Sequence, residues 1–330
     1  MANVLITGGA GFIGSNLADR LTARGDKVFV IDDLSTGRAT NVSDNITFVE
    51  GSIVDFETCE KLFDQAQPDL VVHAAASYKD PTNWENDIRV NIQGTANIVK
   101  LAQKHEVNRF VYFQTSLCYG HHPLEQPITL SHPIQPDNSY SITKVGGERF
   151  IEMSGLDWVS FRLANVYGPR NLSGPVPTFF HKLNKDEQCY ISDARRDFIF
   201  IDDLLEIVEM ALDGKGASGH YHVGTGHDDS IQTIYDHVTA AMDLKQGTTE
   251  NQQRMFGRFW DDVKTILIDP SHTLEVFGQI PTTPLSAGIP KAIEWYYNNE
   301  IIETYTHLSS DELKVRSEQR AAAEAGEASE

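Results

Sequence analysis

The sequence predicts an α/β protein in which a doubly wound parallel sheet is followed by a smaller C-terminal α/β lobe. Three observations support this prediction. Short runs rich in β-branched residues alternate with segments of helical periodicity, a glycine-rich turn joins the first strand to the first helix, and the alternation weakens after residue 168. Strands that alternate with helices favour a parallel sheet with helices on both faces.

The first elements follow one another in a regular order. The run VLIT is an expected strand, and apolar residues then recur at helical spacing through Phe12, Ile13, Leu17 and Leu21 until Gly25, a plausible helix stop. The later expected strands are KVFVID, NITFVEGS, DLVVHAA and RFVYFQTS, and the expected helices between them are DFETCEKLFDQAQ and DIRVNIQGTANIVKLAQKH.

The chain has 330 residues, enough for one large or two modest domains. We expect residues 1–168 to form the first domain, with 195–222, a strand running into a helix, returning to it. Residues 169–194 begin in a loop rich in Gly and Pro and are expected to form the smaller lobe together with 223–310. Residues 311–330 have almost no large apolar side chains, which predicts a disordered tail.

Composition excludes several classes of function. A formal net charge of −20 leaves no basic footprint for nucleic acid. No apolar run approaches the roughly 20 residues that span a membrane, and no signal peptide precedes the first strand. The cysteines Cys59, Cys118 and Cys189 lie far apart, with neither metal-site spacing nor a disulfide framework. We therefore expect a cytoplasmic protein without a bound metal.

The glycine-rich turn predicts a dinucleotide site. Gly8, Gly11 and Gly14 have the spacing G-x-x-G-x-x-G between a strand and a helix. Glycine lets a pyrophosphate approach the backbone, and the start of the helix offers free N–H groups. Asp32 ends the next strand, where a carboxylate can accept hydrogen bonds from both ribose hydroxyls and would repel a 2′-phosphate. The pattern therefore favours NAD over NADP.

A second motif, Y-x-x-x-K, predicts acid–base chemistry. Tyr140 and Lys144 share one face of an expected helix. A lysine ammonium beside a tyrosine favours the phenolate and lowers the tyrosine pKa from its ordinary value of about 10. Such a tyrosine can take a proton from a sugar hydroxyl while hydride leaves the same carbon. Thr115 or Ser116 could supply a third hydroxyl, but adjacent strand residues point to opposite faces, so only one should face the site.

The motifs TGGAGFIG, IDDLSTG, VVHAAA, NIQGTANI, FQTSLCYG, YSITK, RLANVYGPR and RRDFIFIDDL occur in this order over residues 3–205. With them the chain resembles the extended short-chain dehydrogenases/reductases of the NAD-dependent epimerase/dehydratase family, which have a Rossmann-type fold. The phrases YKDP and FQTSLCYG are also similar to those of epimerases from bacterial surface-polysaccharide clusters, which implies a role in glycan synthesis.

The resemblance implies roles for further residues. Thr115 would be the catalytic hydroxyl, with Ser116 as the fallback, and Asn91 would support the Tyr140–Lys144 pair. Ser52 stands where the family usually has an adenine-contacting Asp. The other residues that the resemblance places at the cofactor are Phe12, Ile13, Asp33, Leu34, Ser35, Gly37, Ile53, Ala74, Ala75, Ala76 and Leu163.

The resemblance also implies a nucleotide diphosphate sugar as substrate, most simply a UDP-sugar. Arg196 would contact phosphate, since a guanidinium suits a diphosphate. Asn165 and Arg170 would approach the diphosphate, and Arg258, with Arg254 as a rival, would be a second phosphate ligand. Tyr78 and Lys79 would overhang the sugar. Lys79 either pairs with a C6 carboxylate, which would indicate a uronic acid, or is a surface residue.

The expected reaction is inversion at C4 of the sugar. Family dehydratases carry an Asp-Glu pair directly after the catalytic Thr, whereas Ser116 and Leu117 stand here. A leucine cannot act as an acid or a base, so 4,6-dehydration is disfavoured. A nucleotide-sugar dehydrogenase or ketoreductase that releases its product, or a 4,6-dehydratase, remains the alternative. The resemblance further implies a homodimer formed by helices around residues 86–104 and 138–153.

Overall fold

The computed structural model describes residues 1–187, 189–246, 253–256, 265–278, 282–301 and 303–305. The tail expected over residues 311–330 lies outside the described residues. Within the described part of the chain, none of the helices combines the length and the apolar character needed to cross a membrane.

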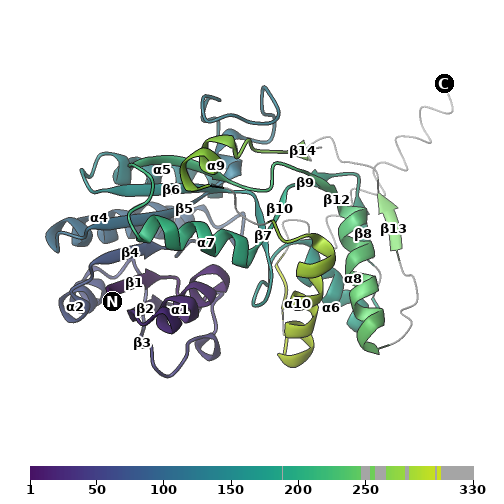
Figure 1. Ribbon diagram of the computed structural model, residues 1–330, viewed down its shortest axis with the longest axis horizontal. Helices are drawn as coiled ribbons and strands as arrows, with labels where there is room; N and C mark the ends of the chain where they lie inside the picture. Colours follow the sequence, from purple (N-terminus) through teal and green to yellow (C-terminus); the bar gives the residue numbers. More distant parts are fainter. Residues whose placement is uncertain (188, 247–252, 257–264, 279–281, 302, 306–330) are drawn as a thin grey trace.

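A seven-stranded parallel sheet forms the centre of the fold (Figure 1). Its strand order is β11-β6-β5-β4-β1-β2-β3, and every neighbouring pair is parallel. The order reverses between β1 and β4, and in such sheets ligands bind at the reversal, beyond the carboxyl ends of the strands. The strands are β1 (Asn3–Thr7), β2 (Lys27–Asp32), β3 (Thr47–Glu50), β4 (Leu70–His73), β5 (Arg109–Thr115), β6 (Trp158–Leu163) and β11 (Gly219–Val223). The predicted fold class is confirmed.

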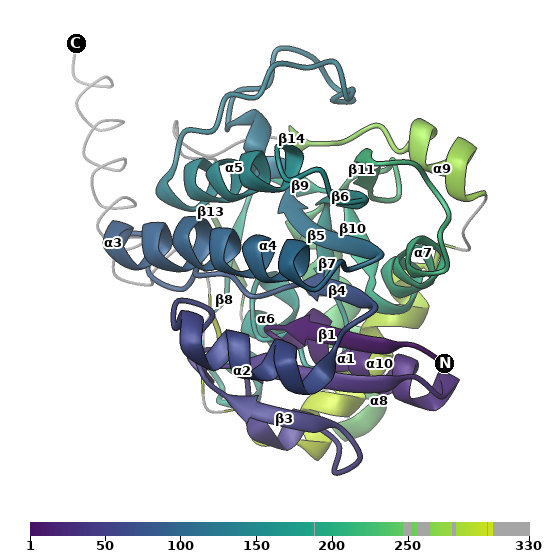
Figure 2. The same ribbon diagram turned by 90° about the vertical axis from the view of Figure 1, so that its left-hand side faces the viewer.

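Helices cover both faces of this sheet (Figure 2). Side chains of β1 alternate between the two cores, as the pleat of a strand requires. Val4 and Ile6 pack in one core with Leu17 and Leu204, and Leu5 packs in the other. The first core lies under α1 (Phe12–Arg24) and α7 (Ile201–Leu212), and the second under α2 (Phe56–Ala66), α4 (Thr95–Lys104) and α5 (Ser139–Glu152).

The remaining elements are short strands and helices, most of them beside the main sheet (Figure 1). The short strands are β7 (Asn165–Tyr167), β8 (Cys189–Ser192), β9 (Arg195–Arg196), β10 (Phe198–Phe200), β12 (Asp229–Ser230), β13 (Gln253–Phe256) and β14 (Thr265–Ile266). The helices are α3 (Trp84–Asp87), α6 (Pro175–Asn184), α8 (Ile231–Gln246), α9 (Ser271–Phe277) and α10 (Leu285–Asn298), with 3-10 turns at Ala39–Asn41 and Ser116–Tyr119. The domain boundaries stay a prediction.

The long helix expected around residues 86–104 is not uniform. A π-helical segment, Ile88–Gly94, separates α3 from α4. Thr95 donates its hydroxyl to the backbone carbonyl of Asn91 over 2.7 Å. Periodicity alone could not reveal this, because an apolar pattern of helical spacing is common to α- and π-helical turns. Short π-helical segments occur preferentially at functional sites.

Helix α5 packs very closely against this π-helical segment. Its start is fixed by a capping box between Asn138 and Ser141. A Cβ atom on Gly147 would lie 2.4 Å from the carbonyl oxygen of Asn91, whereas a Cβ on Gly146 would meet the flexible end of Ile92 at 3.0 Å. Gly147 therefore permits the backbones of α5 and the π-helical segment to approach.

We predict that Gly147→Ala destabilises the protein by about 2 kcal/mol, because the clash with backbone outweighs the gain of roughly 1 kcal/mol in helix propensity. The control, Gly146→Ala, gains the same propensity and meets only a movable side chain, so it should be as stable as wild type or more stable by up to about 1 kcal/mol. Thermal and urea unfolding of both variants would measure the difference. Equal stability of the two variants would contradict this account of the packing.

Candidate functional site

The glycine-rich loop after β1 forms a cradle with little room for side chains. Gly8 has a φ of +68°, and a Cβ there would lie 2.6 Å from the backbone nitrogen of Ala75. A Cβ on Gly14 would lie 2.3 Å from the Gly8 carbonyl oxygen. Gly11 is the N-cap residue of α1 and has no side chain that could accept a hydrogen bond. The first backbone N–H groups of α1 therefore have no side-chain partner at this end of the helix. This geometry fits a pyrophosphate.

Asp32 ties the loop to the end of β2. One carboxylate oxygen accepts a hydrogen bond from the backbone nitrogen of Ala10 over 3.0 Å, and the other accepts from Leu34 over 2.9 Å. Burial raises the pKa of Asp32, and these hydrogen bonds act in the opposite direction. Each carboxylate oxygen retains lone-pair capacity, so Asp32 can also accept from ribose hydroxyls. A Cβ on Gly37 would lie 2.8 Å from the carboxylate, which keeps this position small.

The cofactor residues predicted from the sequence gather at one edge of the sheet. Asp32, Thr115 and Leu163 end β2, β5 and β6, and the other segments directly follow β1, β2, β3 and β4. These segments contain Phe12, Ile13, Asp33, Leu34, Ser35, Gly37, Ser52, Ile53, Ala74, Ala75 and Ala76. All therefore lie near the carboxyl ends of parallel strands, where doubly wound sheets bind ligands. Their individual contacts with a cofactor stay a prediction.

A buried chain of hydrogen bonds runs beneath this edge. The hydroxyl of Thr95 donates to the carbonyl of Asn91, so it accepts from Nε2 of His73 over 2.9 Å. Nδ1 of His73 then accepts from the hydroxyl of Thr7 over 2.6 Å, and that hydroxyl accepts from the nitrogen of Ala75. Burial lowers the pKa of His73 to about 3, so its ring is neutral. These hydrogen bonds connect the segments that follow β1 and β4 to the π-helical segment.

Asn91 extends this connection to the helix of the predicted catalytic pair. Its amide exchanges hydrogen bonds with the backbone of Ser77 and donates to the hydroxyl of Thr143 over 3.1 Å. Thr143 lies on α5 between Tyr140 and Lys144. The resemblance implies such a supporting role for Asn91, whereas sequence reasoning missed its partners. Only the His in VVHAAA, an isolated polar residue in an apolar strand, could have indicated the buried chain.

Asp87 supports the same region from α3. It is fully buried and accepts hydrogen bonds from the hydroxyls of Ser77 and Ser139, over 2.7 and 2.6 Å. Ser139 directly precedes Tyr140, so the start of α5 is held from two sides. The sequence analysis gave no role to Asp87, because its partners lie in two distant segments.

The predicted catalytic pair is buried, and burial changes its electrostatics. Tyr140 lies edge-on to Tyr78, with ring centroids 6.3 Å apart, and the Lys144 nitrogen lies 3.9 Å from the centroid of the Tyr112 ring. Burial raises the pKa of Tyr140, and nearby Tyr78 and Asp87 act in the same direction. The Tyr140 pKa therefore lies above its ordinary value in this structure, and the expected net lowering is wrong because burial outweighs any effect of Lys144. Burial also lowers the pKa of Lys144 to about 7, which weakens its effect as a positive neighbour.

Thr115 and Ser116 occupy different positions at the end of β5. The Thr115 hydroxyl accepts from the nitrogen of Leu117 over 3.2 Å and so caps the turn that follows. This accepting role leaves its hydrogen available for donation. Ser116 lies within the turn and is buried. The choice of Thr115 as the catalytic hydroxyl stays a prediction.

The described members of the predicted substrate set have partners in different segments of the chain. Arg170 pairs with Asp19 on α1 over 2.7 Å, and Asn165 donates to the carbonyl of Asp197 over 3.2 Å. Arg196 lies on β9 and donates to the carbonyl of Arg195. Arg258 lies outside the described residues, and no side-chain position is described for its rival Arg254.

Tyr78 and Lys79 contact segments from both ends of the chain. Tyr78 lies close to Thr36, in the loop after β2, and near Tyr140. The Lys79 ammonium pairs with Glu303 over 2.9 Å and lies 4.6 Å from the centroid of the Tyr305 ring. Glu303 thus gives Lys79 a carboxylate partner within the chain. This geometry does not support a pairing of Lys79 with a sugar carboxylate, and that pairing stays a prediction.

Comparison with known proteins agrees with this geometry. A family model described as the NAD dependent epimerase/dehydratase family matches residues 4–224. A UDP-glucose 4-epimerase of Mycolicibacterium smegmatis is 31% identical over 89% of this chain and 98% of its own length. The Bordetella bronchiseptica enzyme WbmH, solved in complex with NAD+, is 47% identical, with a TM-score of 0.85 and coverage of 90% of this chain and 99% of its own.

A second Bordetella bronchiseptica enzyme, WbmG, was solved in complex with NAD and UDP. It is 38% identical to this chain, with a TM-score of 0.84, and the match covers 93% of this chain and 99% of WbmG. Together these matches confirm the family resemblance inferred from the motifs, and with it NAD as the cofactor.

We predict that Gly11→Ala loses NAD but keeps the fold. A Cβ on Gly11 would lie 3.2 Å from the Gly8 carbonyl oxygen, a tight contact that a shift of a few tenths of an ångström in the loop would relieve, so we expect the fold to survive. The same methyl group would occupy the approach of a pyrophosphate to the start of α1. We expect at least a tenfold loss of affinity, about 1.4 kcal/mol, by calorimetry, with an unfolding temperature close to wild type. Undiminished NAD affinity would contradict this assignment of the loop.

Proposed function

The chain belongs to the NAD dependent epimerase/dehydratase family, and from this premise we propose that it inverts C4 of a nucleotide diphosphate sugar through a transient 4-keto sugar. The observation that carries the proposal is the position of Tyr140. Its ring lies beside Tyr78, which follows β4 and lies close to Thr36 in the loop after β2. The proposed base and the glycine loop therefore share one edge of the sheet.

The proposed proton transfers use residues of this chain. In its phenolate form, the Tyr140 oxygen takes the proton of the sugar 4-OH, becomes a phenol, and returns this proton after the sugar has turned over. The Thr115 hydroxyl donates a hydrogen bond to the same sugar oxygen, and Lys144 in its charged form stabilises the phenolate of Tyr140. Bound NAD supplies the hydride acceptor and then the hydride donor at C4. Asn91 orients α5 through Thr143, so it acts on the pair indirectly.

The residues after Thr115 favour epimerisation over loss of water. Leu117 packs against a buried apolar cluster around Cys118 and Tyr119, and Ser116 precedes it in the turn. Neither side chain can serve as the carboxylic acid that elimination of a C6 hydroxyl requires. Release of an oxidised or reduced product, or a 4,6-dehydration with an acid from elsewhere in the chain, is the second candidate.

We propose a UDP-sugar as the substrate: a UDP-hexose, a UDP-N-acetylhexosamine or a UDP-uronic acid. The similarity to WbmG, which was solved with UDP, supports the nucleotide. Arg196 is the proposed phosphate contact, with Asn165 nearby, because Asn165 begins β7 and Arg196 lies two residues before β10, the strand that pairs with β7. A role in polysaccharide synthesis in the cytoplasm belongs to this proposal, and three buried free cysteines suit a reducing compartment.

We predict that the purified chain, without added cofactor, converts UDP-glucuronate or UDP-N-acetylglucosamine into a product of equal mass with inverted C4. Mass spectrometry and NMR would identify the product. Tyr140→Phe should lower kcat at least a hundredfold, since the proton acceptor is lost while the buried ring remains. Loss of water, or turnover only with added NAD(P)H, would contradict C4 epimerisation in favour of the second candidate.

We also propose a homodimer formed by α3, the π-helical segment, α4 and α5. These helices lie side by side on one face of the protein (Figure 2). Large apolar side chains are exposed on them, namely Trp84, Ile88, Ile142, Phe150 and Met153 at the end of α5. An exposed apolar surface of this kind is typical of an interface.

Light scattering after gel filtration should therefore give twice the chain mass of 36.8 kDa. Phe150→Asp should shift the equilibrium toward the monomer, because it places a charge within the apolar contact. Leu124→Asp is the matched control, since Leu124 is an exposed apolar residue that does not belong to these helices, and its substitution should leave the dimer intact. A wild-type monomer at micromolar concentration would refute the proposed assembly.

A further inference from the structure

We infer that Glu148 is a positioning residue for the proposed proton transfer: its buried carboxylate, one turn beyond Lys144 on the same face of α5, keeps a proton on the Lys144 amine. The inference rests on the proposed function, because that function is what gives Lys144 its role. Tyr140, Lys144 and Glu148 follow one another at i, i+4 and i+8, which places them along one stripe of the helix.

The tyrosines and the histidine around Lys144 are uncharged and cannot hold its proton. Tyr112 of β5 lies under the ammonium, and burial raises its pKa, so it keeps its proton. Tyr140 is protonated for the same reason, and His73 of β4 is neutral. Burial lowers the pKa of Lys144 to about 7, and the negative charge of Glu148 opposes this by raising the same pKa. Asp87 of α3 raises the pKa of Tyr140 and so helps to keep that side chain protonated.

The surroundings of Glu148 keep its carboxylate charged. Its side chain is fully buried, and one oxygen accepts a hydrogen bond from Ser160 over 2.5 Å. The other oxygen accepts from Arg162 over 3.2 Å. Burial alone would raise the pKa of Glu148, but Arg162 and His220 hold it below its ordinary value. The charge of Glu148 is therefore a fixed property of the folded chain.

A second set of hydrogen bonds fixes Arg162 in place. Its guanidinium also donates to the hydroxyl of Tyr119 over 2.8 Å, and His222 accepts from that hydroxyl over 2.6 Å. His222 is a ring-nitrogen donor to the carbonyl of Asp269. Since Arg162 is held by Glu148 on one side and by Tyr119 on the other, the Glu148 carboxylate that pairs with it is also held in place.

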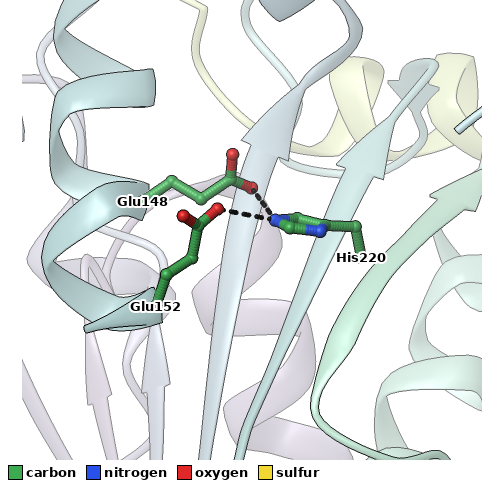
Figure 3. Close-up of side chains that lie close together, drawn as sticks. All are labelled: Glu148, Glu152 and His220. Atoms are coloured by element: carbon green, nitrogen blue, oxygen red, sulfur yellow. Dashed lines mark hydrogen bonds and ion pairs between the residues drawn. The ribbon is translucent and has the colours of Figure 1, made fainter. Parts of the chain in front are cut away.

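Figure 3 shows Glu148 and Glu152 converging on His220. Oxygens of Glu152 and Glu148 lie 2.9 and 3.7 Å from Nε2 of His220. The Arg162 guanidinium already balances the negative charge of Glu148, so this cluster does not need a bound metal cation for that purpose. Glu152 shares the contact with His220 but lies one turn farther from Lys144, which makes it a matched control.

The test is the protonation of Lys144 in the full chain with bound NAD. Lysine labelled with ¹³C at Cε reports its own titration by NMR, and Lys144→Met identifies the signal. Glu148→Gln keeps the shape of the side chain but removes its charge. We expect the Lys144 titration midpoint to fall by about one pH unit or more, a tenfold loss of the charged form, and Glu152→Gln to shift it by less than about 0.3 unit.

Activity should move in the same direction. A group that must be charged by a proton is active below its pKa and inactive above it, so loss of Glu148 should shift the alkaline limb of the kcat profile to lower pH. A Lys144 midpoint in Glu148→Gln within about 0.3 unit of wild type would overturn the inference. A wild-type chain without turnover would overturn the proposed function, whereas the midpoints would still decide whether Glu148 holds the proton.

A second variant guards against misfolding, because Glu148→Gln leaves Arg162 buried without its counter-charge. The double variant E148M/R162M replaces the buried pair by apolar side chains, which folded proteins often tolerate. Because this variant also removes the positive charge of Arg162, we expect a smaller fall of the Lys144 midpoint than in Glu148→Gln. A midpoint above that of wild type would overturn the inference.

Discussion

The buried chain of hydrogen bonds from Thr7 through His73 and Thr95 to Asn91 is the constraint on which the site depends. Polar groups buried without partners are costly, so each member fixes the position of the next. These hydrogen bonds begin beside the glycine loop and end at Asn91, which bonds to Thr143 of α5. They therefore set the distance between α5 and the edge of the sheet where the cofactor residues lie. A neutral His73, with its proton on Nε2, is what allows this sequence of donors and acceptors.

Much of the fold and the location of the site could be predicted from the sequence because they follow from local patterns. Parallel strands align their carboxyl ends, so Gly11, Asp32 and Thr115 had to meet at one edge once the strands were recognised. The π-helical segment could not be predicted, because its apolar spacing matches that of an α-helix. The role of Asn91 came only from a family resemblance, since its partners lie in other segments.

Charge at the site was the least predictable property. The Y-x-x-x-K spacing places Lys144 near Tyr140, but it says nothing of how far both side chains are removed from water. That depends on β4, β5 and the π-helical segment, which are distant in sequence. Loop charges behave similarly: Lys79 pairs with Glu303 and Arg170 with Asp19, each across a long stretch of chain.

The π-helical segment makes the length of this helix as important as its composition. One wide turn rotates everything after it relative to everything before it, so α3 can direct Asp87 toward Ser139 while α4 directs Ile98 into the core. A deletion of one residue between 88 and 94 would leave a good amphipathic sequence and yet turn Asn91 away from Thr143. We therefore expect this segment to tolerate substitutions better than insertions or deletions, whereas surface loops readily accept changes of length.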